Sequence, residues 1–269
     1  MKPHKNIKDE AIINFSKHAG TYDASAVIQK KSAENLLYFF KKDLSLIPDG
    51  PVLEIGCGTG LLSEKLSLLT GSRPVVYSDL SRDMLVFCRK RLETQEPENT
   101  LRSFQILDGE NIPDDKLYSL IISNFTFQWF EDLAASLQKQ KNALMETGRI
   151  IFSFPVKGTF REWEDTCREH GMDFHANTLP DESVMEDILR HSGWNGDIRI
   201  QNETQYFKTA LDFFRSLKRI GAATHERGSA LSALEMKKLL TLMDLKKGPD
   251  GVKITYRILY ASLMKTASE

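Results

Sequence analysis

The sequence predicts an α/β protein built on a mostly parallel β-sheet with helices on both faces. Short apolar segments alternate with helix-like segments from about residue 50, which is the pattern of a buried parallel sheet. The first apolar segment runs directly into a glycine-rich turn, and a helix-like segment follows that turn. Polar side chains follow the next apolar segments, at the edge where open α/β sheets bind their ligands.

The bulk composition excludes several classes of protein. A formal net charge of -1, from 36 basic and 37 acidic side chains, predicts no sequence-independent binding to nucleic acid. Three cysteines without C-x-x-C spacing predict neither a disulfide framework nor a metal site. No apolar run approaches the roughly 20 residues that cross a bilayer, and no apolar segment follows the basic start as in a signal peptide. We therefore expect a cytoplasmic protein that does not bind membranes.

The order of the elements suggests four parts. Residues 1–45 are expected to form an N-terminal helical cap, and residues 46–207 the core that carries the ligand site. Residues 208–251 are expected to add inserted helices over the substrate region, and residues 252–269 a final strand that returns to the sheet. In the core, strands are predicted at 51–55, 74–79, 104–107, 119–123, 150–154 and 198–207. Helices are predicted at 131–145, over 158–193 with a break at 176–180, at 209–221 and at 232–245, and a turn at 146–149.

The glycine-rich turn, residues 54–60 (Glu-Ile-Gly-Cys-Gly-Thr-Gly), is the strongest indication of a ligand site. Glycines permit positive φ angles and let the backbone approach a ligand closely. The start of the following helix offers unpaired N–H groups to an anion. Glu54, just before the turn, suits a cationic amino group. A tight β–α turn without a ligand is the alternative reading.

The residues that follow the next strands complete an adenosine-binding pattern. Asp79 ends the second strand about 20 residues further on, where a carboxylate accepts both ribose hydroxyls. Asp108, Gly109 and Glu110 follow the third strand, where an acidic side chain accepts an adenine amino group. Asn124 and Phe125 follow the fourth strand.

These segments resemble the successive motifs of class I S-adenosylmethionine-dependent methyltransferases. The resemblance rests on residues 52–60, 79–85 and 108–110. A dehydrogenase turn has the spacing Gly-x-Gly-x-x-Gly, but here the third glycine comes one residue early, which argues against NAD. The resemblance implies a Rossmann-like, mostly parallel seven-stranded sheet and S-adenosyl-L-methionine as cofactor. The expected cofactor-binding residues are Tyr22, Glu54, Gly56, Cys57, Gly58, Gly60, Asp79, Leu80, Met84, Asp108, Gly109, Glu110, Asn124 and Phe125.

Further segments resemble the malonyl-acyl-carrier-protein O-methyltransferases of biotin synthesis. They are residues 15–23, 124–129, 214–222 and 254–260, so the resemblance covers nearly the whole chain. It implies methyl transfer to the free carboxylate of a malonyl thioester, carried by acyl carrier protein or coenzyme A. The resulting methyl ester primes pimeloyl and biotin synthesis.

The candidate substrate residues follow from that expected chemistry. A carboxylate is already a nucleophile at neutral pH, so no general base is required and catalysis depends on alignment. We expect Tyr22 and Arg215 to position the reactants, because a guanidinium forms paired hydrogen bonds with a carboxylate. The other expected substrate-binding residues are Gln128, Trp129, Lys218 and His225. A local basic surface for the acidic carrier protein is expected from Arg199, Arg215, Lys218, Arg219, Lys237 and Lys238.

Other functions stay open at the level of the sequence. A small-molecule carboxyl, quinone or lipid methyltransferase would share the same fold and cofactor motifs. A nucleic-acid methyltransferase is disfavoured, because residues 124–127 (Asn-Phe-Thr-Phe) lack the Asn/Asp-Pro-Pro-aromatic run that acts on base amines. A non-catalytic cofactor-binding protein is a remote alternative.

Overall fold

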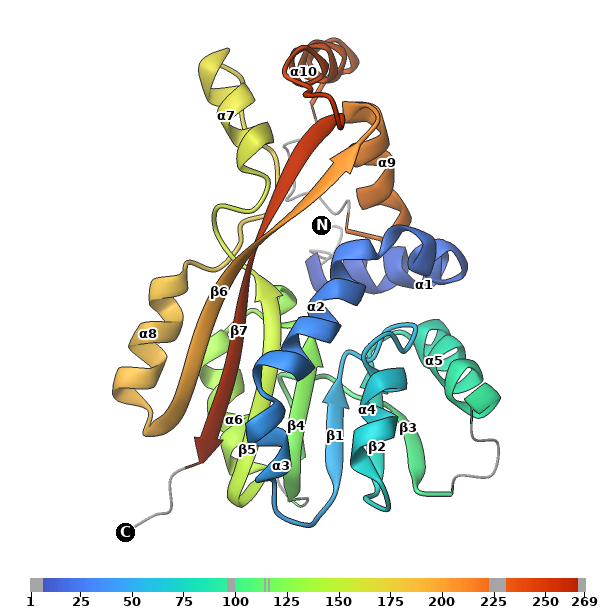
Figure 1. Cartoon of the computed structure of the whole chain (residues 1–269), viewed down its shortest axis with the longest axis vertical. Coiled ribbons are helices and arrows are strands. Elements are labelled where there is room, and N and C mark those ends of the chain that lie inside the picture. The colour runs from blue at the N-terminus through green and yellow to red at the C-terminus, as the bar shows by residue number, and fades with distance from the viewer. Residues whose placement is uncertain (1–6, 96–99, 114, 116, 223–230, 266–269) are drawn as a thin grey trace, which may run out of the picture.

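A computed structural model describes residues 7–95, 100–113, 115, 117–222 and 231–265. Seven strands form one sheet with the order β3-β2-β1-β4-β5-β7-β6 (Figure 1). The first five are parallel, β7 runs antiparallel to β5, and β6 runs antiparallel to β7. The predicted α/β fold class is confirmed. The strands are β1 Val52–Ile55, β2 Val75–Asp79, β3 Arg102–Ile106, β4 Tyr118–Asn124, β5 Leu144–Pro155, β6 Trp194–Phe207 and β7 Val252–Lys265.

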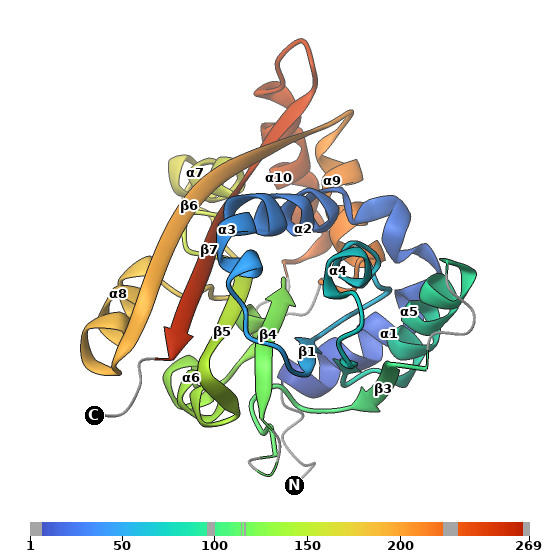
Figure 2. The same ribbon diagram turned by 60° about the horizontal axis from the view of Figure 1, so that its bottom comes forward.

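Helices cover both faces of this sheet and produce two hydrophobic cores (Figure 2). One core packs the strands against α2, α4 and α5, and the other packs them against α6 and α8. Neighbouring side chains of β1 enter different cores, Val52 the first and Leu53 the second, so every residue of β1 is buried. The helices are α1 Ile7–Ser25, α2 Val27–Phe39, α3 Lys41–Ser45, α4 Ser63–Thr70, α5 Arg82–Gln95, α6 Leu133–Asn142, α7 Arg161–Glu169, α8 Glu182–His191, α9 Ala210–Arg219 and α10 Ala233–Leu245.

The turn predicted at residues 146–149, between the helix at 131–145 and the strand at 150–154, is wrong. These residues lie within β5, which begins at Leu144. The register with β4 moves from Tyr118↔Leu144 to Leu120↔Arg149, so the chain loops out of the ladder and rejoins it. Thr147 takes a φ of 60°, which accounts for the turn-like sequence. The preceding helix α6 therefore ends at Asn142, three residues earlier than predicted.

The predicted helical segment at 158–193 divides at its break into α7 and α8. The side chains of α7 enter the first core and those of α8 the second. The two later helices also form where the apolar pattern predicts them, as α9 and α10. Local capping explains where both begin, because Thr209 caps α9 and Ser232 and Glu235 form a capping box on α10.

The long strands β6 and β7 carry the chain beyond the carboxyl ends of the parallel strands, where α1, α7, α9 and α10 gather (Figure 1). Contacts of α9 with α1 and of α10 with α7 and α9 join these helices into one cover. Across the described part of the chain, none of the helices combines the length and apolar character that crossing a bilayer requires.

Candidate active site

The glycine-rich turn lies between β1 and α4, at the carboxyl edge of the sheet. Its three glycines have φ angles of 67° (Gly56), 53° (Gly58) and 92° (Gly60), a region that favours glycine. At Gly56 a Cβ atom would also lie 2.7 Å from Cγ2 of Thr126, so the turn leaves no room for a side chain there. The positive φ angles explain glycine at all three positions, and the contact with Thr126 adds a second requirement at Gly56.

Asp79 joins the turn to the end of β2. Its carboxylate accepts a hydrogen bond from the Gly58 N–H at 2.9 Å and from the Ser81 N–H at 2.8 Å. Burial raises the pKa of Asp79 to about 6, although the backbone N–H donors favour its ionised form. Asp79 is therefore an acceptor whose charge changes close to neutral pH.

A cavity of about 100 Å³ opens beside the turn. Most of the predicted cofactor residues line it, and they come from α1, the glycine turn, the ends of β2, β3 and β4, and the start of α5. Those lining it are Tyr22, Gly56, Gly58, Asp79, Leu80, Met84, Asp108, Gly109, Asn124 and Phe125. Glu54, Cys57, Gly60 and Glu110 lie outside the lining. Their predicted contact with a cofactor therefore stays a prediction.

Glu54 lies buried at the end of β1, beneath the turn. One of its carboxylate oxygens, Oε2, has no hydrogen-bond partner among the described residues. Burial raises the pKa of Glu54 well above its usual range. A buried carboxylate oxygen without a donor is the kind of group that a cationic ligand satisfies.

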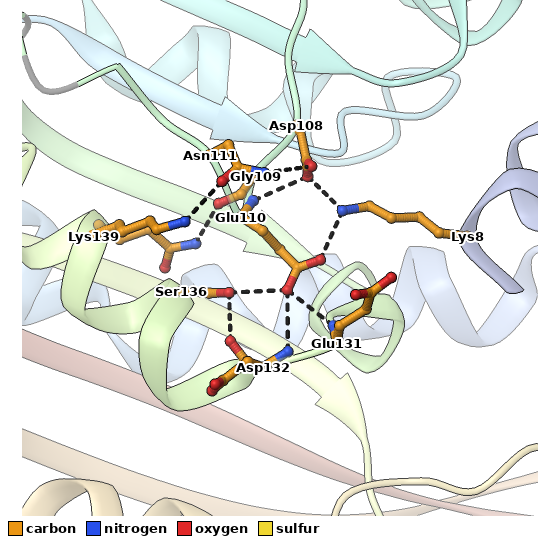
Figure 3. A network of polar contacts seen from close by, with 10 residues as sticks. Lys8, Asp108, Gly109, Glu110, Asn111, Glu131, Asp132, Ser136 and Lys139 are labelled. Carbon is orange, nitrogen blue, oxygen red and sulfur yellow. Dashed lines mark hydrogen bonds and ion pairs between the residues drawn. The ribbon is translucent and has the colours of Figure 1, made fainter. Parts of the chain in front are cut away.

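Lys8 of α1 closes the other side of the cavity, and sequence reasoning missed it (Figure 3). Its ammonium group lies 2.6 Å from the Asp108 carboxylate and 2.7 Å from that of Glu110. Burial acts to raise the pKa of Asp108, but the bond from Lys8 and further donors hold it below its usual range. Because about 100 residues separate Lys8 from its partners in the sequence, no local pattern could have revealed the contact.

Glu110 organises the start of α6 instead of lining the cavity (Figure 3). Its Oε1 accepts the N–H groups of Glu131 at 2.9 Å and Asp132 at 3.2 Å, and the hydroxyl of Ser136 at 3.1 Å. The other oxygen bonds Lys8. A carboxylate at a helix N-terminus is stabilised by the free N–H groups and the helix dipole. Glu110 thus connects α1, the Asp108 loop and α6.

A second cavity of about 300 Å³ adjoins the first and shares four lining residues with it: Phe15, Tyr22, Phe125 and Trp129. Its walls are mostly aromatic and aliphatic, and they come mainly from α1, α7, α9, α10, β7 and the loop before α8. Lys218 and His175 are the basic side chains among the described lining residues. The shared wall means that a ligand in one cavity lies next to a ligand in the other.

Some of the predicted substrate-binding residues line this second cavity and others do not. Gln128, Trp129 and Lys218 line it, whereas Arg215 does not. Arg215 is exposed on the outer side of α9, with its guanidinium 3.8 Å from Asp212. His225 lies outside the residues that the structure describes.

His175 was not anticipated, because it lies in the loop between α7 and α8 and no sequence motif marks it. Phe15 lies in a segment of family resemblance, but its place between the two cavities depends on how α1 folds over the sheet.

Comparisons with known proteins agree with this geometry. Residues 52–148 match a family model described as a methyltransferase domain. The crystal structure of YcgJ from Bacillus subtilis aligns with a TM-score of 0.58 at 14% identity, covering 85% of this chain and all of that one. Magnesium protoporphyrin IX methyltransferase from Synechocystis, solved with bound S-adenosylhomocysteine, aligns with a TM-score of 0.55 at 14% identity, over 87% of this chain and 82% of that one.

The fold, the glycine turn and the matched domain define a class I, S-adenosylmethionine-dependent methyltransferase. Two curated relatives are closer in sequence. The malonyl-[acyl-carrier protein] O-methyltransferase of Priestia megaterium is 31% identical, covering 94% of this chain and 96% of its own length. That of Magnetococcus marinus is also 31% identical, covering 92% of this chain and 89% of its own length. The chain belongs to the malonyl-[acyl-carrier protein] O-methyltransferase family.

Proposed function

We propose that this protein transfers the methyl group of S-adenosylmethionine to the free carboxylate of a malonyl thioester, with malonyl-acyl carrier protein as the substrate. The observation that carries the proposal is the pair of adjoining cavities, one at the glycine turn and one lined by apolar side chains with Lys218 at its wall. Family membership selects the malonyl thioester among the carboxylates that such a cavity accepts.

The first cavity fits the cofactor in the chemistry of its donors and acceptors. Asp79 would accept the ribose hydroxyls, and Asp108 the adenine amino group. Glu54 lies outside the cavity lining, buried beneath the turn, and its unpartnered carboxylate oxygen is the candidate acceptor for the cationic amino group. Gly58 lines the cavity, and no atom lies within 4 Å of the position of its Cβ, so its backbone is open to the ligand. When bound, the cofactor supplies a sulfonium-activated methyl group.

The chain has to align and desolvate the acceptor, because a malonyl carboxylate is ionised at neutral pH and needs no base. Phe15, Phe125 and Trp129 form the shared wall and exclude water there. Tyr22 lies at the same wall. Burial, with the charges of Asp79 and Asp23, raises the pKa of Tyr22, so its hydroxyl stays protonated and can donate a hydrogen bond.

Lys218 is the stronger candidate for holding the substrate anion. It lines the acceptor cavity, and its ammonium group has no ion pair among the described residues, whereas Arg215 lies outside and faces Asp212. A hydrogen bond from a charged group contributes about 1.5–3 kcal/mol. We therefore expect Lys218→Met to lower kcat/KM for malonyl-acyl carrier protein by about 10- to 100-fold, with unchanged cofactor affinity.

Arg215→Met is the matched comparison, because it removes a neighbouring cation from the same helix. It should change kcat/KM less than Lys218→Met does. A larger loss in Arg215→Met would instead support the guanidinium as the residue that positions the carboxylate.

Four basic residues could receive the acidic carrier protein beside the acceptor cavity. Lys218 and Arg219 end α9, exposed Lys237 and Lys238 lie on α10, and the two helices are in contact. Arg199 is not part of this group, since its guanidinium lies over the Phe39 ring of α2, 5.5 Å from the centroid.

Charge reversal on α10 tests this docking surface. We expect the double variant Lys237→Glu/Lys238→Glu to raise KM for the carrier-bound substrate by about three- to tenfold at low salt, and less at 0.5 M salt. KM for malonyl-coenzyme A should change less. Reversal of the exposed pair Lys41 and Lys42 on α3 is the control, and an equal effect there would refute the assigned surface.

The proposed reaction itself is tested by intact-mass measurement of malonyl-acyl carrier protein after incubation with the enzyme and labelled cofactor. A gain of one methyl group that an esterase removes supports the proposal. Methylation of free malonate, a quinone or another small carboxylate, with none on the carrier-bound substrate, would replace it with a small-molecule methyltransferase of the same fold.

A further inference from the structure

A chain of buried hydroxyl groups leads from α2 to the side chain of Asn124 at the cofactor cavity. The side-chain amide oxygen of Asn124 accepts the Ser153 hydroxyl at 2.7 Å, and the Ser153 hydroxyl lies 3.0 Å from the Ser32 hydroxyl on α2. Ser32 and Ser153 are fully buried.

A second group of polar contacts lies one turn further along α2. The Asn35 side-chain amide donates to the Tyr260 hydroxyl at 3.5 Å and to the Glu203 carboxylate at 2.8 Å. Glu203 has 3% of its side chain exposed and also bonds Lys31 at 2.5 Å. Ser32 and Asn35 thus join α2 to β5, β6 and β7, and these contacts fix the helix that carries the Ser32 hydroxyl.

Each hydroxyl in this path has one hydrogen to donate, and this determines its direction. Ser153 donates to the Asn124 side chain, so it accepts from Ser32. Both bonds therefore point toward the side-chain oxygen of Asn124. Hydrogen bonds aligned in this way polarise one another, which makes the side-chain N–H of Asn124 a stronger donor.

Hydrogen bonds hold both polar atoms of the Asn124 side-chain amide. Its oxygen accepts the Ser153 hydroxyl, and one of its N–H groups donates to the backbone carbonyl of Gln29 at 3.1 Å. No described residue accepts its second N–H, and Asn124 lines the cofactor cavity. Without the hydroxyl of Ser153, the amide would lose the bond that distinguishes its two orientations.

We propose that Ser153 and Ser32 are positioning residues that hold and polarise the Asn124 side-chain amide, so that its remaining N–H binds a carboxylate at the reacting centre. The carboxylate belongs either to the amino-acid end of the cofactor or to the methyl acceptor. The identity of the acceptor carboxylate rests on the proposed function. Binding of the cofactor's carboxylate by Asn124 does not depend on the malonyl substrate.

Ser153→Ala tests the proposal, with Ser119→Ala as the matched control. Ser119 is an equally buried serine on neighbouring β4, but its hydroxyl donates only to the backbone carbonyls of Gly50 and Pro51. Both variants should lose similar stability in urea. Only Ser153→Ala should weaken ligand binding, by about three- to tenfold. Ser32→Ala, which removes the hydroxyl one bond further from Asn124, should have a smaller effect on the same quantity.

The measured quantities distinguish the two carboxylates. A raised Kd for S-adenosylmethionine in calorimetry identifies the carboxylate of the cofactor, and a raised KM for malonyl-acyl carrier protein at saturating cofactor identifies that of the acceptor. If both constants stay at wild-type values in Ser153→Ala, or change equally in Ser119→Ala, the positioning role is refuted. Failure of the proposed function would appear separately, as absence of methyl transfer by the wild-type enzyme. In that case the Kd for S-adenosylmethionine alone tests the positioning role.

Discussion

Replacement of Asp79 by Asn is expected to weaken S-adenosylmethionine binding by at least about a hundredfold. The carboxylate already accepts two backbone N–H groups, from Gly58 and Ser81, and would also accept the ribose hydroxyls. An asparagine turns one accepting oxygen into an NH₂ group that faces a backbone N–H. Loss of two hydrogen bonds to a charged group corresponds to about 3–6 kcal/mol. Isothermal titration calorimetry measures the change.

Asp83→Asn is the control, because Asp83 lies exposed in the first turn of the following helix α5. It removes the same charge a few residues away and should leave cofactor affinity within about twofold. Equal loss in both variants would mean that net charge, and not the acceptor geometry of Asp79, supports binding.

The same carboxylate predicts how cofactor binding depends on pH. Burial raises the pKa of Asp79 to about 6 in the cofactor-free protein, and the ribose hydroxyls stabilise its ionised form. The Kd for S-adenosylmethionine should therefore rise as the pH falls below about 6, by up to about tenfold per pH unit. Asp79→Asn should lose this component of the pH dependence.

The effect on stability has the opposite sign. The folded-state pKa of Asp79 exceeds its ordinary value of 3.8, so the folded protein holds this proton more tightly than the unfolded chain. The contribution of Asp79 to the stability of the cofactor-free protein is therefore fully present below pH 3.8 and is lost as the pH rises through about 6. At neutral pH the cofactor-free protein carries an ionised buried group that the cofactor would satisfy.

Gly56→Ala is the second variant with a large expected effect. A Cβ atom at this position would meet Oγ1, Cγ2 and Cβ of Thr126, and the φ of 67° disfavours any residue but glycine. Overpacking and left-handed strain together are expected to lower the free energy of unfolding by about 2–5 kcal/mol. Because the displaced turn carries the neighbour Gly58, cofactor binding should be lost as well. Urea denaturation and calorimetry measure the two effects.

Gly71→Ala separates the strain from the clash. Gly71 has a φ of 56°, but no atom lies within 4 Å of the position of its Cβ, and it ends α4 away from both cavities. It should lose only the penalty of the positive φ, about 1–3 kcal/mol, and keep full cofactor affinity. A stability loss in Gly56→Ala no greater than that in Gly71→Ala would show that Thr126 yields to the added methyl group.

The cofactor half of the site could be predicted because its geometry is local to each strand end. Gly56 and Gly58 follow β1, Asp79 ends β2, and Asp108 follows β3. Parallel strands place their carboxyl ends on one edge, so sequence order alone brings these residues together. The exception is Glu110, whose side chain turns away to hold the start of α6.

The predicted substrate-binding residues on α9 were harder to assign, because helical spacing alone does not tell which side of the helix faces the cavity. Arg215 and Lys218 are three residues apart, so both stand near one side of α9. Lys218 is also four residues from Phe214, which lines the cavity, whereas Arg215 turns outward to Asp212. The apolar residues 213, 214, 217 and 220 carried the signal that distinguishes them, because they mark the packed face of the helix.

The sequence by itself determined the fold class, the glycine turn and the acidic residues around it, because periodicity, positive-φ glycines and strand ends are local properties of the chain. Tertiary structure alone decided that Lys8 bonds Asp108 and Glu110, that His175 lines the second cavity, and that Ser153 and Ser32 lead to Asn124. The hydrogen bonds among these contacts join residues 29 to 121 positions apart in the sequence. Their partners are set by the packing of helices and strands on one sheet, which no local pattern encodes.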